Sequence, residues 1–186
     1  MRIVAGSAKG MSLRVPKSAR PTPDRVRESI FSTLGHRGYL DDTLVLDLFA
    51  GSGAFGLEAA SRGVRGVTAV DLSREATGII LSNAKKTGLD VKVVNSKAST
   101  YLGSVVTEFD LIFMDPPYSM PDEQLVPVLE AAVPRLVDDG ILLVERDKFA
   151  GEPPWPEGLV LDDEKTWGDT VIWSALRADY ARRLNP

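Results

Sequence analysis

Cysteine is absent from this chain of 186 residues, and histidine occurs once, at position 36. Without cysteine there can be no disulfide, no thiolate metal site and no cysteine nucleophile. A lone His36 argues against a histidine triad or a zinc site, so we expect no metal. No apolar run approaches the roughly 20 residues of a membrane helix, and no signal-peptide pattern opens the chain. We therefore expect a cytoplasmic protein without a membrane partner.

Charge is distributed unevenly along the chain. The net charge is −4, but residues 1–40 carry a net +6 and the remaining residues a net −10. A basic segment on an acidic body indicates a polyanionic partner such as nucleic acid, although an ordinary solvated face would carry the same charges. The length allows one domain with a substantial core. We expect a basic N-terminal extension over residues 1–40 and the main domain over residues 41–186.

The extension divides into two predicted elements. Loose alternation of apolar residues around a glycine-containing turn predicts a β-hairpin over residues 1–15, with basic residues at its exposed positions. Thr22 and Pro23 suit the N-cap and first position of a helix. Arg25 and Arg27 are expected to lie off its apolar stripe. Four residues form that stripe: Val26, Ile30, Phe31 and Leu34.

Strands and helices alternate through the rest of the chain. Apolar runs predict strands at 44–49, 67–71, 91–95, 109–114 and 141–145, and helical patterns occupy 53–62, 73–88 and about 123–136. The last two strands, 159–165 and 170–176, have no helix between them and should pair as an antiparallel hairpin. This order predicts an α/β fold with a Rossmann-like, mostly parallel sheet and a C-terminal antiparallel hairpin, as in S-adenosylmethionine-dependent methyltransferases.

A glycine turn follows the first of these strands. Gly51, Gly53 and Gly56 satisfy G-x-G-x-x-G, and Asp71 ends the next strand, where a carboxylate can bind a ribose diol. Dinucleotide enzymes and S-adenosylmethionine enzymes share these features. The second class typically carries an acid four positions before the first glycine, as Asp47 does. Asp47 is expected either to order this turn or to meet the methionine end of the cofactor.

A second motif, Asp115-Pro116-Pro117-Tyr118, closes the strand at 109–114. Ligands of open α/β sheets bind outside the carboxyl ends of the strands, so this motif and the glycine turn should face one crevice. The motif resembles the [D/N]-P-P-[Y/F/W] of amino-methyltransferases. The Asp115 carboxylate and the Pro116 carbonyl can each accept an N–H of a base amine, and Tyr118 can stack on the extruded base. The missing cysteine excludes covalent methylation of pyrimidine C5.

Most of the chain resembles one family, the bacterial small-subunit ribosomal RNA guanine-N2 methyltransferases called RsmD. The resemblance spans residues 1 to about 176. It implies S-adenosylmethionine as cofactor and the N2 amine of guanine 966 of 16S rRNA, in the assembling small subunit, as the target. The matching segments are Arg2-Ile3-Val4-Ala5-Gly6, Arg20-Pro21-Thr22, Asp24 to Glu28, Phe31, Asp47 to Gly53, and Asp115 to Tyr118.

These arguments define the expected site. Asp115, Pro116 and Tyr118 are the expected catalytic residues. Cofactor contacts are expected from Asp47, Phe49, Gly51, Gly53, Asp71, Leu72, Ser96, Lys97, Ala98 and Asp115. RNA contacts are expected from Arg2, Lys9, Arg14, Arg20, Arg25 and Tyr118. Two departures from the family pattern stand out: Ser32 replaces a common Asn, and Lys97 replaces an acid that would accept from the adenine amine. Backbone groups around Lys97 would then read the adenine.

Several alternatives remain open. Thr22 and Arg25 suit either the methionine carboxylate or an RNA phosphate. An adenine-N6 methyltransferase on RNA or DNA would use the same tetrapeptide, although a sequence-specific DNA enzyme usually needs a further domain. A non-catalytic RNA-binding assembly factor would retain the fold. A nicotinamide oxidoreductase is disfavoured by Asp47 and by the terminal hairpin. We expect a monomer.

Overall fold

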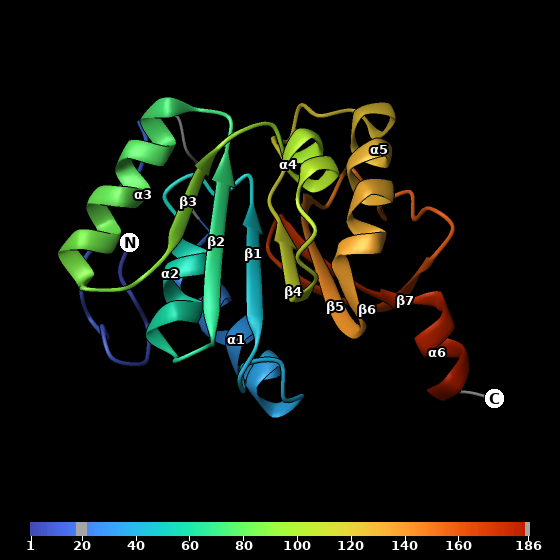
Figure 1. Cartoon of the computed structure of the whole chain (residues 1–186), viewed down its shortest axis with the longest axis horizontal. Coiled ribbons are helices and arrows are strands. Elements are labelled where there is room, and N and C mark those ends of the chain that lie inside the picture. Colours follow the sequence, from blue (N-terminus) through green and yellow to red (C-terminus); the bar gives the residue numbers. More distant parts are fainter. Residues whose placement is uncertain (18–21, 185–186) are drawn as a thin grey trace.

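The computed structural model describes residues 1–17 and 22–184 and is centred on a seven-stranded sheet of order β3-β2-β1-β4-β5-β7-β6 (Figure 1). The first five strands pair in parallel, and β7 runs antiparallel to both β5 and β6. The predicted fold class is confirmed. The strands are β1 (Leu44–Leu48), β2 (Gly66–Asp71), β3 (Lys92–Asn95), β4 (Phe109–Met114), β5 (Leu136–Asp147), β6 (Leu159–Trp167) and β7 (Thr170–Arg177).

Helices cover both faces of the sheet, as Figure 1 shows. One core lies between the sheet and α1, α2 and α3, and a second lies under α4 and α5. None of the helices in residues 1–17 and 22–184 combines the length and apolar character that a membrane crossing requires. The helices are α1 (Asp24–His36), α2 (Ala54–Ser61), α3 (Arg74–Thr87), α4 (Ala98–Ser104), α5 (Asp122–Ala132), the short 3₁₀ helix η1 (Val133–Arg135) and α6 (Ala178–Leu184).

In the main domain, strand β5 and helix α6 differ most from the sequence prediction. Strand β5 begins at Leu136, five residues early, because it pairs first with Phe109 and then shifts register to pair Ile141 with Leu111. Gly140 makes this possible, since a Cβ there would lie 3.1 Å from the carbonyl oxygen of Asp110. Helix α6 had no counterpart in the prediction.

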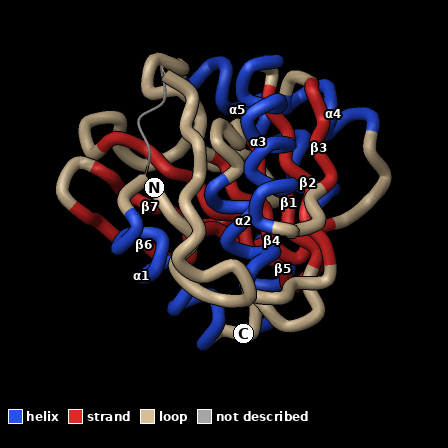
Figure 2. The backbone as a smooth tube through the Cα atoms, turned by 90° about the vertical axis from the view of Figure 1, so that its left-hand side faces the viewer, coloured by secondary structure: helices blue, strands red, loops and turns tan. Residues whose placement is uncertain are grey.

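The first 17 residues fold back on themselves but add no strand to the sheet. A single antiparallel bridge joins Arg2 to Ser12, so the predicted hairpin is present only in reduced form. Its strands cannot extend because the backbone N–H groups of Val4 and Ala5 donate to the Glu58 carboxylate of α2, at 2.8 and 3.0 Å. In Figure 2 this tan segment crosses the front of the molecule.

The same N-terminal segment is part of the core. Ile3, Ala8 and Leu13 are buried in the cluster that holds α1, α2 and α3. At Gly6 a Cβ would lie 1.8 Å from the carbonyl oxygen of Ser61, so only glycine permits this approach to α2. The described residues before position 40 therefore share one core with the rest of the chain, whereas the domain boundary near residue 40 stays a prediction from composition.

Helix α1 corrects two expectations. Thr22 is not the N-cap: Pro23 holds that position, and the Thr22 hydroxyl donates instead to Glu145 of β5 at 2.8 Å. Arg27 is buried, with 1% of its surface exposed, although it was expected off the apolar stripe. The reason is helical spacing: positions 27, 31 and 34 fall on one face, so Arg27 shares the buried face with Phe31.

Candidate active site

A cavity of about 60 Å³ lies at the carboxyl ends of β1 and β4. Two aromatic rings form part of its wall: Phe55 of α2 stacks on Phe113 of β4 with ring centres 3.8 Å apart. Its polar lining groups come from α1 and the residues before it, from β1 and the turn after it, and from the residue that follows β4. The lining side chains used below are Thr22, Arg27, Asp47, Phe49 and Asp115, together with the backbone of Gly51.

The turn after β1 has three residues in the left-handed backbone region. These are Phe49, Gly51 and Gly53, with φ of +57°, +56° and +74°. Such a conformation is uncommon for a residue with a Cβ, and at Phe49 it marks a turn held by its surroundings. A Cβ on Gly51 would meet no atom within 4 Å, so this glycine leaves open space at the cavity, as expected.

Gly53 has a different reason for lacking a side chain. A Cβ there would lie 2.9 Å from Cγ2 of Ile80 in α3, so the close packing of α3 on the turn requires glycine. Its N–H donates to the carbonyl oxygen of Ala50 at 2.7 Å. Gly53 was expected to let a ligand approach the backbone. The packing of α3 on the turn is by itself a sufficient reason for glycine at this position. Spacing alone cannot separate these roles.

Asp71 links the glycine turn after β1 to the turn after β2. Its carboxylate accepts from the backbone N–H of Gly51 at 2.9 Å and from that of Ser73 at 2.8 Å. Ser73 also caps α3, as predicted, by accepting from the N–H of Ala76 at 3.2 Å. Because each carboxylate oxygen has two lone pairs, Asp71 retains acceptor capacity for ribose hydroxyls.

Asp47 of β1 is bonded to the first turn of α2, which follows the glycine turn. It is 1% exposed, and its carboxylate accepts from the N–H of Gly56 at 2.9 Å. Burial raises the pKa of Asp47 to about 8, with the hydrogen bond from Gly56 lowering it and the Asp71 charge raising it. A Cβ on Gly56 would lie 3.2 Å from Asp47 Oδ2, so glycine at this position permits the hydrogen bond.

Asp115 follows β4 directly and lines the same cavity as Asp47 and Gly51. The expected meeting of the Asp115 tetrapeptide with the glycine turn is thus present. Pro116 is buried and Tyr118 is exposed. Burial, then the Glu145 carboxylate and then the Asp47 carboxylate raise the pKa of Asp115 well above its ordinary value.

Glu145 is a site residue that the sequence reasoning missed. It is 2% exposed, accepts from the Thr22 hydroxyl, and has a pKa raised by burial. Since Met114 pairs with Val144 in register, the next residues on the two parallel strands, Asp115 and Glu145, are neighbours. An acid at the carboxyl end of a predicted buried strand was the available signal.

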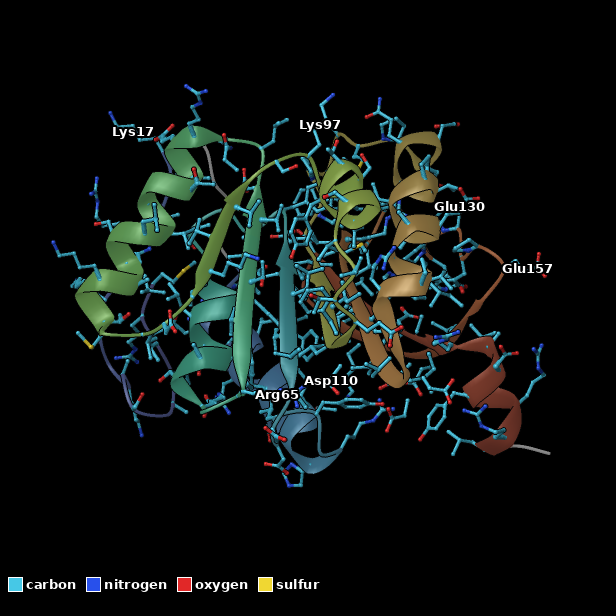
Figure 3. The ribbon with its side chains drawn as sticks, viewed as in Figure 1. Lys17, Arg65, Lys97, Asp110, Glu130 and Glu157 are labelled. Carbon is cyan, nitrogen blue, oxygen red and sulfur yellow. The ribbon has the colours of Figure 1, made fainter. Side chains whose placement is uncertain are left out.

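The remaining expected cofactor contacts, Leu72 and residues 96–98, follow strands β2 and β3. Leu72 is 64% exposed, and the backbone N–H of Ser96 donates to the carbonyl oxygen of Asp71 at 3.0 Å. Ala98 is buried in α4, whereas Lys97 points away from the ribbon (Figure 3). None of these four residues lines the 60 Å³ cavity.

The expected RNA contacts are spread over the surface. Exposed side chains at these positions are Arg2, Lys9, Arg14 and Arg25, whereas Arg20 lies outside the described residues. Arg2 pairs with Asp24 at 3.3 Å. In the described part of the chain, no group of three or more acidic, histidine or cysteine side chains is placed to hold a metal ion.

Comparisons with known proteins agree with this geometry. Residues 1–175 match the family model described as Conserved hypothetical protein 95. The Ribosomal RNA small subunit methyltransferase D of Escherichia coli K12 is 37% identical over 176 residues, covering 92% of this chain and 87% of its own. The structure of a hypothetical protein from Thermus thermophilus superposes with a TM-score of 0.84 at 32% identity, covering 96% and 99% of the two chains.

A more distant solved methyltransferase, 16% identical with a TM-score of 0.65, has the same fold and was determined in complex with SAH; it covers 81% of this chain and 48% of its own. The fold is thus one that S-adenosylmethionine-dependent methyltransferases use. The family match over nearly the whole chain is the stronger observation. The chain belongs to the Conserved hypothetical protein 95 family, the RsmD family of methyltransferases.

Proposed function

We propose that this protein transfers a methyl group from S-adenosylmethionine to the N2 amine of guanine 966 of 16S rRNA. The observation that carries the proposal is the shared cavity of Asp115, Asp47 and the Gly51 turn. In this proposal the amine and the cofactor would bind next to each other, as direct transfer requires. The name of the E. coli relative supports small-subunit rRNA as substrate.

The residues beside the cavity fit an adenosyl sulfonium compound. Asp71 stands next to the open backbone of Gly51, where a ribose diol finds an acceptor. Leu72 presents an exposed apolar surface beside it, suited to the face of an adenine. When bound, S-adenosylmethionine supplies an electrophilic methyl on a positively charged sulfur.

Asp115 and Pro116 would act on the nucleophile. An exocyclic amine is a poor nucleophile because its lone pair is delocalised into the ring. Acceptance of its two N–H groups by the Asp115 carboxylate and the Pro116 carbonyl orients that lone pair and stabilises developing positive charge. Proline fixes φ and therefore the direction of the carbonyl. Tyr118, exposed at the rim, would stack on the base.

The raised pKa of Asp115 links base binding to ionisation. Only the charged carboxylate accepts without donating, and hydrogen bonds from the amine favour that charged form. Since burial, Glu145 and Asp47 oppose the charge, the free protein holds a proton on this group over a wider pH range than an ordinary Asp. We expect kcat/KM to rise with pH through the ionisation of Asp115.

Methylation of undermethylated ribosomal RNA tests the proposal. Naked 16S rRNA and small subunits from a strain lacking this activity are incubated with the cofactor, and digested nucleosides are identified by mass. N2-methylguanosine is the expected product. N6-methyladenosine would assign the rival specificity, and no product with either substrate would leave only RNA binding. We expect the assembled subunit to be the better substrate, since a short basic segment cannot select one base alone.

Salt dependence tests the RNA surface. Replacing Arg2, Lys9, Arg14 and Lys17 together by glutamine should lower the log–log salt slope of RNA binding by about 0.7–0.9 for each phosphate that is no longer neutralised. The affinity for S-adenosylhomocysteine should stay the same, because none of these side chains lines the cavity. An unchanged slope and an unchanged methylation rate would place the RNA surface elsewhere.

A further inference from the structure

Arg27 is a buried cation whose hydrogen bonds are incomplete. It lies in the first turn of α1 and is 1% exposed, which is rare for arginine unless it is paired. Its Nη1 donates to the carbonyl oxygen of Thr22 at 3.1 Å, and its Nη2 donates to the Asp24 carboxylate at 2.9 Å and to the carbonyl oxygen of Arg2. Its Nε is buried and has no hydrogen-bond partner in the described part of the chain.

These contacts hold the guanidinium in place without using all of it. The Nη groups tie α1 to the N-terminal segment, which accounts for a structural role on that side. A buried donor without a partner is unfavourable, and native structures contain few of them. The Nε–H of Arg27 is therefore available to a group that enters the site.

The cavity supplies the direction from which such a group would come. Arg27 lines it together with Asp47, Phe49 and Asp115, and it is the basic residue among the described lining residues. Without Arg27, the charged side chains that line this cavity would be those of Asp47 and Asp115. With Arg27 present, the lining offers one cationic side chain to an anion and two acids to a cation.

We infer that Arg27 binds the α-carboxylate at the amino-acid end of the adenosyl cofactor, an inference that rests on the proposed function. The amino-acid end carries a carboxylate and an ammonium group. The free Nε–H of Arg27 can donate a charge-assisted hydrogen bond to a carboxylate, and the acids of the cavity suit the ammonium. Arg25, one alternative from the sequence, is exposed on the same helical turn, and Thr22 is engaged by Glu145.

Two ligands that differ only in the carboxylate separate this role from a structural one. S-adenosylhomocysteine and its decarboxylated analogue, which keeps the ammonium, are titrated into the full-length protein by calorimetry. The wild-type protein should bind S-adenosylhomocysteine about 10- to 150-fold more tightly, the range expected for a charge-assisted hydrogen bond. In Arg27→Met the two ligands should bind within about twofold of each other, whereas Arg25→Met should keep the full preference.

Each other outcome has a definite meaning. If Arg27→Met weakens both ligands by the same factor, Arg27 only supports the fold and the inference is wrong. Loss of the preference in Arg25→Met instead would assign the carboxylate to Arg25. If Arg27→Met does not fold, the wild-type protein still decides, because equal affinity for the two ligands overturns the assignment. Failure of the wild-type protein to bind either ligand would overturn the proposed cofactor, and the inference with it.

Discussion

Strand β4 carries an aspartate near each end, and the two aspartates have opposite surroundings. Near the amino end, Asp110 accepts from the backbone N–H of Leu44 at 2.7 Å and lies 3.8 Å from Arg65, as the labelled side chains in Figure 3 allow the reader to follow. Just beyond the carboxyl end, Asp115 is raised in pKa by burial and by Glu145 and Asp47. The first aspartate has a cation within 4 Å, whereas burial and two neighbouring carboxyls set the pKa of the second.

The difference distinguishes structural charge from functional charge. Like charges gathered in a buried place raise one another's pKa and destabilise the folded state, whereas a partly exposed pair such as Asp110 with Arg65 is close to neutral for stability. Strongly perturbed carboxyls in a cleft are characteristic of functional sites. The carboxyl end of the sheet, with Asp47, Asp115 and Glu145, is therefore organised for a ligand rather than for stability.

Replacing Asp115 and Asp110 by alanine, one at a time, should give the largest difference in kcat between two variants. Asp115→Ala should reduce kcat at least about 100-fold, the scale of removing one group that stabilises developing charge. Asp110→Ala should leave kcat unchanged, since that side chain lies at the other edge. Asn at position 115 should retain part of the activity because it keeps one acceptor. Methylation assays on the same RNA measure all three, and an Asp115→Ala enzyme with full activity would exclude the proposed mechanism.

Replacing Asp71, at the carboxyl end of β2, should have a smaller effect, and on cofactor affinity rather than on kcat. Asp71→Ala removes the expected ribose acceptor and should weaken S-adenosylhomocysteine binding about 10- to 150-fold. Part of this loss would come from the turn, because Asp71 also accepts from Gly51 and Ser73. Asp71→Asn keeps an acceptor for the turn and should lose less. Calorimetry that finds unchanged affinity in the alanine variant would reduce Asp71 to a turn-ordering residue.

The buried acid of β1 should appear in the pH dependence of stability. Asp47 has a folded-state pKa of about 8 against an ordinary 3.8, so between these values the folded state holds a proton that the unfolded state has lost. Its contribution to the free energy of unfolding therefore falls as pH rises through this window, by at most about 1.4 kcal/mol per pH unit. Asp47→Asn should remove that fall. Urea unfolding between pH 5 and pH 7.5 measures the difference, and equal slopes in both proteins would contradict it.

Replacing Arg65, at the amino-end edge of the sheet, should have the smallest effect on stability and activity. Arg65 lies 3.6 Å from Asp42 and 3.8 Å from Asp110, in pairs that are largely open to solvent. Such pairs contribute about 0–1 kcal/mol, so Arg65→Ala should shift the free energy of unfolding by no more than this and leave methylation unchanged. A larger shift in the free energy of unfolding, or lost activity, would contradict the view that only the carboxyl-end acids serve function.

Local patterns in the sequence were sufficient for much of the fold. Apolar runs predicted where the strands of the main domain lie along the chain, and the absence of a helix between the last two predicted the antiparallel hairpin. Ser73 and Gly88 marked the ends of α3 because capping depends on neighbouring residues alone. The glycine turn and the Asp115 tetrapeptide were likewise placed at one edge, since parallel strands bring their carboxyl ends together.

Only the tertiary structure shows which residues far apart in the sequence form hydrogen bonds or bury one another. Thr22 was expected to cap its own helix, but its hydroxyl bonds Glu145, 123 positions away. The N-terminal segment adds no strand to the sheet because its backbone N–H groups donate to Glu58 and Ser61 of α2. Arg27 was expected off the apolar stripe of its helix, but it is buried and lines the cavity. Burial and hydrogen-bond partners depend on which elements pack together, and that packing is set by the whole chain rather than by any short segment of it.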